Sequence, residues 1–212
     1  MYKVLMAAIA VASLATAAQA VTLINGSFED GVEPGAFVTL AGGDVTSLTG
    51  WTVQPAGVDY IGSYWVASDG SRSLDMSALD GGQITQTLTG LVAGKTYTVG
   101  FDMSGNPTGG NATRRLTVSA TGGLPETFSY AMSAGNSLTD MLWQRYSYSF
   151  IASSATQDLQ FLSQEHNPFG PALDNVTLSV VPEPAVWGLM IFGFAVTGLA
   201  SRRRARASSF SA

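Results

Sequence analysis

Hydrophobic and polar residues alternate along most of the chain between residues 21 and 180. In residues 97–103, for example, Tyr, Val, Phe and Met at the odd positions are separated by Thr98, Gly100 and Asp102. A repeat of two residues places successive side chains on opposite faces of a β-strand, so that one face packs on a core and the other meets solvent. Further predicted strands lie at 83–88, 116–120, 126–130, 146–150, 159–163 and 176–180.

These predicted strands are short and separated by turns. Gly, Pro, Asn and Asp interrupt the alternation about every eight to twelve residues, a spacing typical of an all-β sandwich or barrel. No segment between the two ends has a long helical period. The sequence therefore predicts an all-β fold, an antiparallel β-sandwich of jelly-roll type, in one domain over residues 21–180.

Both ends of the chain break this pattern with apolar runs. Residues 1–20 combine Lys3, an apolar core and an Ala-Gln-Ala motif at 18–20, which together predict a signal peptide that signal peptidase removes before Val21. Near the other end, residues 185–200 carry no charge and predict a transmembrane helix. At ~1.5 Å per residue this helix would span ~24 Å, slightly less than the ~30 Å hydrocarbon core of a bilayer.

A short motif and a basic cluster flank this C-terminal apolar segment. The motif is Val181-Pro182-Glu183-Pro184, whose prolines favour a stiff, extended spacer. The basic cluster is Arg202, Arg203, Arg204 and Arg206, which the positive-inside rule places on the cytoplasmic side. In this order the three parts resemble the PEP-CTERM sorting signal of Gram-negative bacteria.

The resemblance implies that residues 181–206 anchor the protein transiently in the inner membrane until an exosortase-like enzyme cleaves near the motif. A permanent tail anchor without processing is the alternative. We expect residues 207–212 to form a disordered tail.

The region between the two ends is acidic and the chain lacks cysteine. Residues 21–180 hold 5 basic and 14 acidic side chains, a net charge of −9. This charge argues against nucleic acid as a partner, because nucleic acid requires a basic surface. It favours neutral ligands and divalent cations. Without cysteine no disulfide can form, which suggests calcium as an alternative staple.

Several motifs in this region resemble the choice-of-anchor C family, which is similar to DUF642 and to the galactose-binding-like jelly rolls. They lie at residues 25–30 (NGSFED), 50–53 (GWTV), 58–65 (VDYIGSYW), 67–76 (ASDGSRSLDM) and 170–176 (GPALDNV). Galactose-binding-like jelly rolls include many carbohydrate-binding modules. The resemblance thus implies a jelly-roll domain that binds polysaccharide of the cell surface or extracellular matrix.

The same resemblance implies a structural calcium ion between the two ends of the domain. In several carbohydrate-binding jelly rolls, an N-terminal N-G-x-F-E and a C-terminal D-[DN]-V clasp such an ion. Carried over by motif, Glu29 and Asp174 would supply carboxylates, and main-chain carbonyls near Asn25 and in the turn at Asp69 would complete the shell. The alternative is that Asn25 and Asp174 only cap turns and Glu29 is a surface charge.

Aromatic side chains beside polar ones predict where a sugar would bind. The densest group is Asp59, Tyr60, Tyr64 and Trp65, in which an aromatic plane could stack on a sugar ring while the carboxylate reads its hydroxyls. The loop at 106–111 is a candidate rim of the cleft. The alternative is that the aromatics form the core. A solvent-facing aromatic pair beside a groove favours binding, whereas burial of all of them favours a structural role.

Catalytic signals are weak in this sequence. His166 is the only histidine and lies in a loop with Pro and Gly, and neither a G-x-S-x-G nor an H-E-x-x-H motif occurs. A glycosidase would need two carboxyl groups at a fixed separation in a cleft. The sequence therefore predicts an exported, non-catalytic carbohydrate-binding protein of the cell surface or biofilm matrix. A purely structural envelope or matrix protein without a discrete ligand is the alternative.

Overall fold

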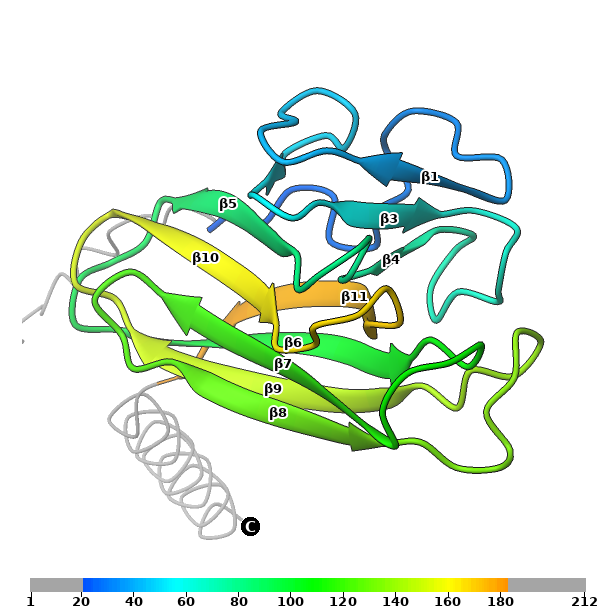
Figure 1. Cartoon of the computed structure of the whole chain (residues 1–212). Helices are drawn as coiled ribbons and strands as arrows, with labels where there is room; N and C mark the ends of the chain where they lie inside the picture. The colour runs from blue at the N-terminus through cyan, green and yellow to red at the C-terminus, as the bar shows by residue number, and fades with distance from the viewer. Residues whose placement is uncertain (1–20, 183–212) are drawn as a thin grey trace, which may run out of the picture.

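The computed structural model describes residues 21–182, which form eleven strands in two antiparallel sheets packed face to face (Figure 1). The six-stranded sheet has the order β1 (Phe37–Leu40), β3 (Val58–Ile61), β4 (Ser73–Asp75), β11 (Pro171–Val180), β6 (Thr96–Gly105), β9 (Gln144–Ile151). The five-stranded sheet has the order β2 (Thr52–Val53), β5 (Gln83–Thr89), β10 (Thr156–Ser163), β7 (Thr113–Ala120), β8 (Glu126–Ala131).

The predicted antiparallel β-sandwich is confirmed. All seven strands that the alternation predicts are present as β5 to β11, whereas β1 to β4 were not predicted as strands. The predicted signal peptide, and the sorting signal from Glu183 onwards, lie outside the described residues. Within residues 21–182 no helix is long and apolar enough to cross a membrane.

The core lies between the two sheets and is rich in aromatic rings. Phe101 of β6 and Phe161 of β10 approach each other across the sandwich with ring centres 5.5 Å apart. Trp51, which precedes β2, packs against Phe161 at 6.0 Å. All three side chains are at most 2% exposed. Offset and edge-to-face contacts of this kind add to the stabilisation that burial alone gives.

A β-bulge interrupts β11, and the N-terminal segment forms a hydrogen bond with this strand at the bulge. The pairing of β11 with β6 shifts between Asp174 and Thr177, and Asn175 adopts a positive φ of 49°. The amide of Val176 is thereby freed to donate to the carbonyl of Gly26 at 2.8 Å. Any side chain at position 26 would collide with the Val176 carbonyl. Bulges of this kind bend a strand and redirect its side chains.

Both ends of the described range lie beside the turn between β9 and β10. Thr22 forms a bridge with Thr89 at the end of β5, and Thr89 pairs with Thr156 at the start of β10. At the other terminus the amide of Val181 donates to the carbonyl of Thr96, whose own partner on β9 is Ile151.

We expect Phe161→Ala to destabilise the domain by about 3–5 kcal/mol, because it opens a cavity between the sheets where Phe161 contacts both Phe101 and Trp51. Urea denaturation of the variant and the wild type measures this loss. Leu124→Ala serves as the control, since Leu124 is 87% exposed, and it should change the unfolding free energy by less than about 0.5 kcal/mol. Equal effects of the two substitutions would contradict this description of the core.

Candidate functional site

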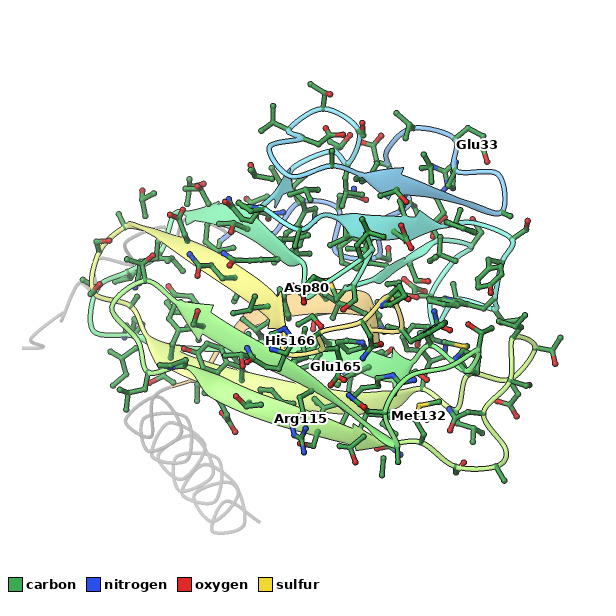
Figure 2. All side chains as sticks on the ribbon, viewed as in Figure 1. Glu33, Asp80, Arg115, Met132, Glu165 and His166 are labelled. Carbon is green, nitrogen blue, oxygen red and sulfur yellow. The ribbon has the colours of Figure 1, made fainter. Side chains whose placement is uncertain are left out.

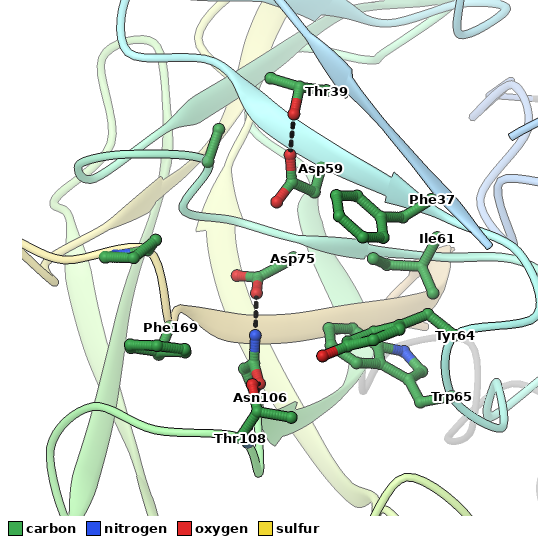
Figure 3. Close-up of a pocket in the computed structure, with 12 residues that line it drawn as sticks. Phe37, Thr39, Asp59, Ile61, Tyr64, Trp65, Asp75, Asn106, Thr108 and Phe169 are labelled. Carbon is green, nitrogen blue, oxygen red and sulfur yellow. Dashed lines mark hydrogen bonds between the residues drawn. The ribbon is translucent and has the colours of Figure 1, made fainter.

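A pocket of about 260 Å³ opens on the outer face of the six-stranded sheet, where β1, β3 and β4 meet two loops (Figure 3). One loop follows β6 and the other precedes β11. The sheet supplies Asp59 and Asp75, and the loops supply Asn106 and Phe169. The complete lining is Phe37, Thr39, Asp59, Ile61, Tyr64, Trp65, Asp75, Ala78, Asn106, Thr108, Pro168 and Phe169.

Two carboxylates occupy opposed positions on neighbouring strands in this pocket. Asp59 of β3 pairs directly with Asp75 of β4, and opposed residues of an antiparallel pair project from the same face. Thr39 Oγ1 donates a hydrogen bond of 2.6 Å to Asp59 Oδ1. No hydrogen bond from residues 21–182 reaches Asp59 Oδ2, so this atom is open to a ligand. Burial raises the pKa of Asp59.

Asp75 lies deeper and joins the sheet to both loops. It is 1% exposed. Its Oδ1 accepts hydrogen bonds from the amides of Ser77 (3.1 Å) and Gly170 (3.0 Å), and its Oδ2 accepts one from Asn106 Nδ2 at 2.8 Å. Burial raises the pKa of Asp75 to about 7 although these hydrogen bonds oppose the rise, and the neighbouring Asp59 adds to it. The two acidic side chains of the pocket therefore both lie on the strands that form its floor.

Aromatic rings form one wall of the pocket (Figure 3). Phe37 and Tyr64 meet edge to face with ring centres 5.4 Å apart, and Trp65 packs against Tyr64 at 5.7 Å. Trp65 is 4% exposed and its indole N–H donates to Ser73 Oγ at 2.8 Å. Phe37 remains 48% exposed and Tyr64 is half-buried. The pocket thus presents two accessible rings on a buried support.

Three of the four predicted ligand-binding residues line this pocket together, namely Asp59, Tyr64 and Trp65. The prediction for Tyr60 is wrong. Tyr60 follows Asp59 on the same strand, so its side chain points to the opposite face, where it is fully buried in the core. Its hydroxyl donates to the carbonyl of Phe28 at 2.5 Å.

The sequence missed several pocket residues, including Phe37, Asp75 and Phe169. They lie far apart in the chain, and only the strand register and the loops bring them together. The expectation that the 106–111 loop rims a cleft is confirmed, because Asn106 and Thr108 line the pocket. Thr108 is held in place by its amide, which donates to Asn106 Oδ1 at 3.0 Å.

A buried arginine organises this 106–111 loop from below. Arg114 of β7 is 1% exposed, and its guanidinium donates to the carbonyls of Asn106 (2.8 Å), Gly109 and Asn111. Its Nε is buried and has no hydrogen-bond partner within the described residues. The adjacent Arg115 is exposed and points away, so the two arginines do not form one basic patch.

The loop at 66–72 continues the aromatic wall and is anchored to β11 by a predicted calcium ligand. Asp174 is fully buried. Its Oδ2 accepts hydrogen bonds from the amides of Ser68 (2.7 Å) and Asp69 (2.9 Å), and its Oδ1 accepts one from the amide of Asn175 at 2.6 Å. Burial raises the pKa of Asp174 to about 7 in spite of these donors.

A second predicted calcium ligand holds the same loop from the N-terminal side. Glu29 Oε1 accepts the amides of Ser71 (2.8 Å) and Arg72 (2.7 Å). Burial opposes ionisation of Glu29, but these hydrogen bonds outweigh it and lower the pKa. Gly70 is required at this contact, because it has a φ of 65° and a Cβ there would lie 2.5 Å from the Glu29 carboxyl carbon.

The remaining predicted ligands are placed as follows. Asn25 caps the N-terminal loop, donating from Nδ2 to the carbonyls of Asp30 (2.7 Å) and Thr49 (3.0 Å), and Asp69 meets Asp174 through its amide. Within residues 21–182 no three His, Asp or Glu side chains gather to hold a metal, so an ion here would need main-chain oxygens. Main-chain N–H groups already occupy both carboxylate oxygens of Asp174, so Ca²⁺ at this position would have to replace these hydrogen bonds. Calcium binding stays a prediction.

The histidine lies apart from the pocket. His166 Nδ1 and Asp80 Oδ1 are 2.9 Å apart, and their side chains are 89% and 60% exposed (Figure 2). A solvated pair of this kind contributes little to stability. No serine hydroxyl is bonded to this imidazole within the described residues, so the arrangement does not resemble a nucleophile with its base.

The pocket aspartate predicts a pH dependence of stability. Because the pKa of Asp75 is raised to about 7 from 3.8 in the folded state, the unfolded chain releases this proton first as pH rises, and stability falls between about pH 4 and pH 7. We expect Asp75 to make the wild type about 2 kcal/mol less stable at pH 7.5 than at pH 5. Urea denaturation of wild type and Asp75→Asn at both values measures this difference. An identical pH profile of the two proteins would contradict the assignment.

Most of this chain is similar to a small part of a much longer protein. Halomucin of Haloquadratum walsbyi is 33% identical over 187 residues, which are 85% of this chain but 2% of Halomucin. The chain therefore spans about one fiftieth of the length of that curated relative.

Among solved structures, likenesses are distant. TmCBM61 in complex with β-1,4-galactotriose has a TM-score of 0.46 at 18% identity, covering 74% of this chain and 96% of that one. A family 35 carbohydrate-binding module from Clostridium thermocellum has a TM-score of 0.43 at 14% identity, covering 67% and 96%. The CBM22-1 xylan-binding domain from Paenibacillus barcinonensis Xyn10C has a TM-score of 0.41 at 16% identity, covering 69% and 94%.

One family matches almost the whole described range. Its description is "Protein of unknown function (DUF642)", and the match runs over residues 21–179. These residues include both sheets, the pocket and the loop anchored by Asp174. The chain belongs to the DUF642 family.

Proposed function

We propose that this protein is a non-catalytic module that binds polysaccharide of the extracellular matrix or cell wall in the pocket between β1, β3 and β4. The observation that carries the proposal is the combination of accessible aromatic rings and hydrogen-bonding groups around one cavity. Tyr64 and Phe37 offer apolar faces, and Asp59 and Asn106 offer polar atoms on the adjoining floor.

This combination suits a sugar better than other small molecules. A pyranose has an apolar C–H face and a rim of hydroxyls, so it needs a ring to stack on and acceptors close to that ring. A cavity of about 260 Å³ lies just below the usual range for drug-sized ligands, which is about 300–1,000 Å³. The solvent-facing pair Phe37 and Tyr64 favours binding over a purely structural role.

We infer binding without hydrolysis. The two carboxylates of the pocket raise the question of a glycosidase, which uses such a pair as acid and base or nucleophile. Asp75, however, is 1% exposed and its carboxylate already accepts hydrogen bonds from three protein donors. A group held in this way supports the architecture of the pocket and is poorly placed to attack or protonate a glycosidic bond.

Export and sorting complete the proposal. The signal peptide predicted at 1–20 and the PEP-CTERM-like segment at 181–206 support delivery to the cell surface or matrix through signal peptidase and an exosortase-like enzyme. The other motifs resemble the choice-of-anchor C family, in which one domain is combined with different surface signals. In this arrangement the β-sandwich binds the polysaccharide, and the C-terminal segment directs the protein to the cell surface or matrix.

We expect Tyr64→Ala to weaken retention on the polysaccharide about tenfold, because a stacking contact of about 1.4 kcal/mol is lost. Retention of the purified protein in affinity gels loaded with different insoluble and matrix polysaccharides measures this effect. Tyr146→Ala is the matched control, since Tyr146 is also half-buried but lies on β9 outside the pocket. Thermal unfolding of each variant confirms that it is folded.

Three outcomes of this experiment would overturn the proposal. The first is that folded wild type is retained on no polysaccharide, which would favour the structural role. The second is that both tyrosine variants lose retention equally. The third is the release of reducing ends during incubation, which would indicate a hydrolase.

We also propose that Ca²⁺ stabilises the domain through Asp174, with Glu29 and main-chain carbonyls near Asn25 and Asp69. We expect the unfolding temperature in excess calcium to exceed that in chelator by several degrees, because an ion that binds only the folded state stabilises it. Asp174→Asn should remove the difference, and Glu126→Gln, which alters an exposed carboxylate on β8, should keep it. An unfolding temperature that chelator does not change would show that hydrogen bonds alone close the loop.

A further inference from the structure

The pocket is acidic and contains no positive charge. Asp59 and Asp75 are the two charged side chains among its twelve lining residues, and none of the twelve is Lys, Arg or His. Directly opposed positions on antiparallel strands have Cβ atoms about 4.5–5.5 Å apart, so the carboxyl groups are close enough to act on one ligand group. In Figure 3 both project towards the open space between the aromatic wall and Phe169.

The nearest arginines are committed elsewhere. Arg114 approaches from below, but its guanidinium donates to the carbonyls of the 106–111 loop. Arg72 lies on the opposite side of β3, where it pairs with Glu33 at 2.8 Å and contacts the ring of Tyr60. Neither guanidinium lines the pocket. Arg114 interacts electrostatically with Asp75 from outside the pocket, so a negatively charged ligand would meet two carboxyl groups and no positively charged side chain within the lining.

The hydrogen-bonding capacity of the floor is one-sided. Asp59 Oδ2 accepts no hydrogen bond from the described residues, whereas both oxygens of Asp75 already accept hydrogen bonds from protein donors. A ligand that binds at this free acceptor must therefore supply a hydrogen-bond donor. An ammonium group supplies three donors and a positive charge, which a pair of carboxylates close together favours. The adjoining face of Tyr64 adds a further attraction for a cation.

We propose that the pocket selects sugars that carry a free amino group, with the ammonium held by Asp59 above the buried Asp75 and the sugar ring stacked on Tyr64. This inference rests on the proposed function, because it assigns a ligand class to the same pocket. Neutral sugars bind more weakly, since their hydroxyls satisfy the acceptors without compensating the charge. Uronates and sulfated sugars are rejected, because they would bring a further negative charge next to Asp59.

The test compares two oligosaccharides that differ in one group. Calorimetric titration of the full chain with a β-1,4-linked glucosamine tetramer and with its fully N-acetylated counterpart, at pH 6 and 150 mM salt, gives the ratio of the two affinities. We expect the amine-bearing tetramer to bind at least tenfold more tightly. Asp59→Asn should bring the ratio close to one while keeping the bond from Thr39, because an amide oxygen still accepts it.

Two further variants separate this effect from general attraction to an acidic protein. Glu126→Gln removes one exposed carboxylate outside the pocket and should leave the ratio unchanged, whereas Tyr64→Ala should weaken both ligands. Equal affinities for the two tetramers, or a preference that Asp59→Asn does not alter, would overturn the inference.

The proposed function can survive that failure. Binding of a neutral polysaccharide that Tyr64→Ala abolishes, together with an affinity ratio near one, would leave the module a carbohydrate binder and refute only the selection for amines. Absence of binding to every glycan would refute both.

Discussion

The hydrogen bonds from the amides of Ser68 and Asp69 to the Asp174 carboxylate hold the loop at 66–72 against the sheet. β11, which carries Asp174, pairs with both β4 and β6 and so lies inside the six-stranded sheet. A carboxylate buried at this position is costly unless donors face it. Closing the sheet around Asp174 therefore requires the 66–72 loop to be in place, next to Tyr64 and Trp65, which hydrogen bonds to Ala36 and Ser73 also hold.

Asp75 applies the same constraint on the floor of the pocket. It is buried beside a second acidic residue, and the amides and side chain that satisfy it come from three separate segments, at Ser77, Asn106 and Gly170. Each of these segments contributes to the pocket or borders it. The groups that shape the site are thus also groups that the fold needs, and substitution of Asp75 will alter both.

The longer strands could be predicted from the sequence because their alternation extends over several residues. β6 has ten residues and β10 has eight, whereas β2 has two and β4 has three, too few for a period to be recognised. The error at Tyr60 has the same cause. Had residues 58–61 been assigned as a strand, Asp59 and Tyr60 could not have been given the same face.

The site itself was predictable only in part. The aromatic and acidic cluster at 59–65 is local in the sequence, so its composition pointed to a pocket. Asp75 enters through its register with Asp59, and Phe169 enters through the loop before β11; neither is apparent without the topology. Likewise, the motifs predicted Glu29 and Asp174 as ligands of one ion, and the amides that these two carboxylates bind became evident only from the folded chain.

The course of β11 determines how the domain is presented to its surroundings. This strand begins next to the pocket, at Pro171, and runs for ten residues to Val180, a length of about 30 Å. The chain therefore leaves the sandwich at the end remote from the pocket, and the N-terminal segment enters at that same end, through the bridge of Thr22 with Thr89. A surface that holds the protein by either terminus would leave the pocket at the far end of the domain, clear of the attachment.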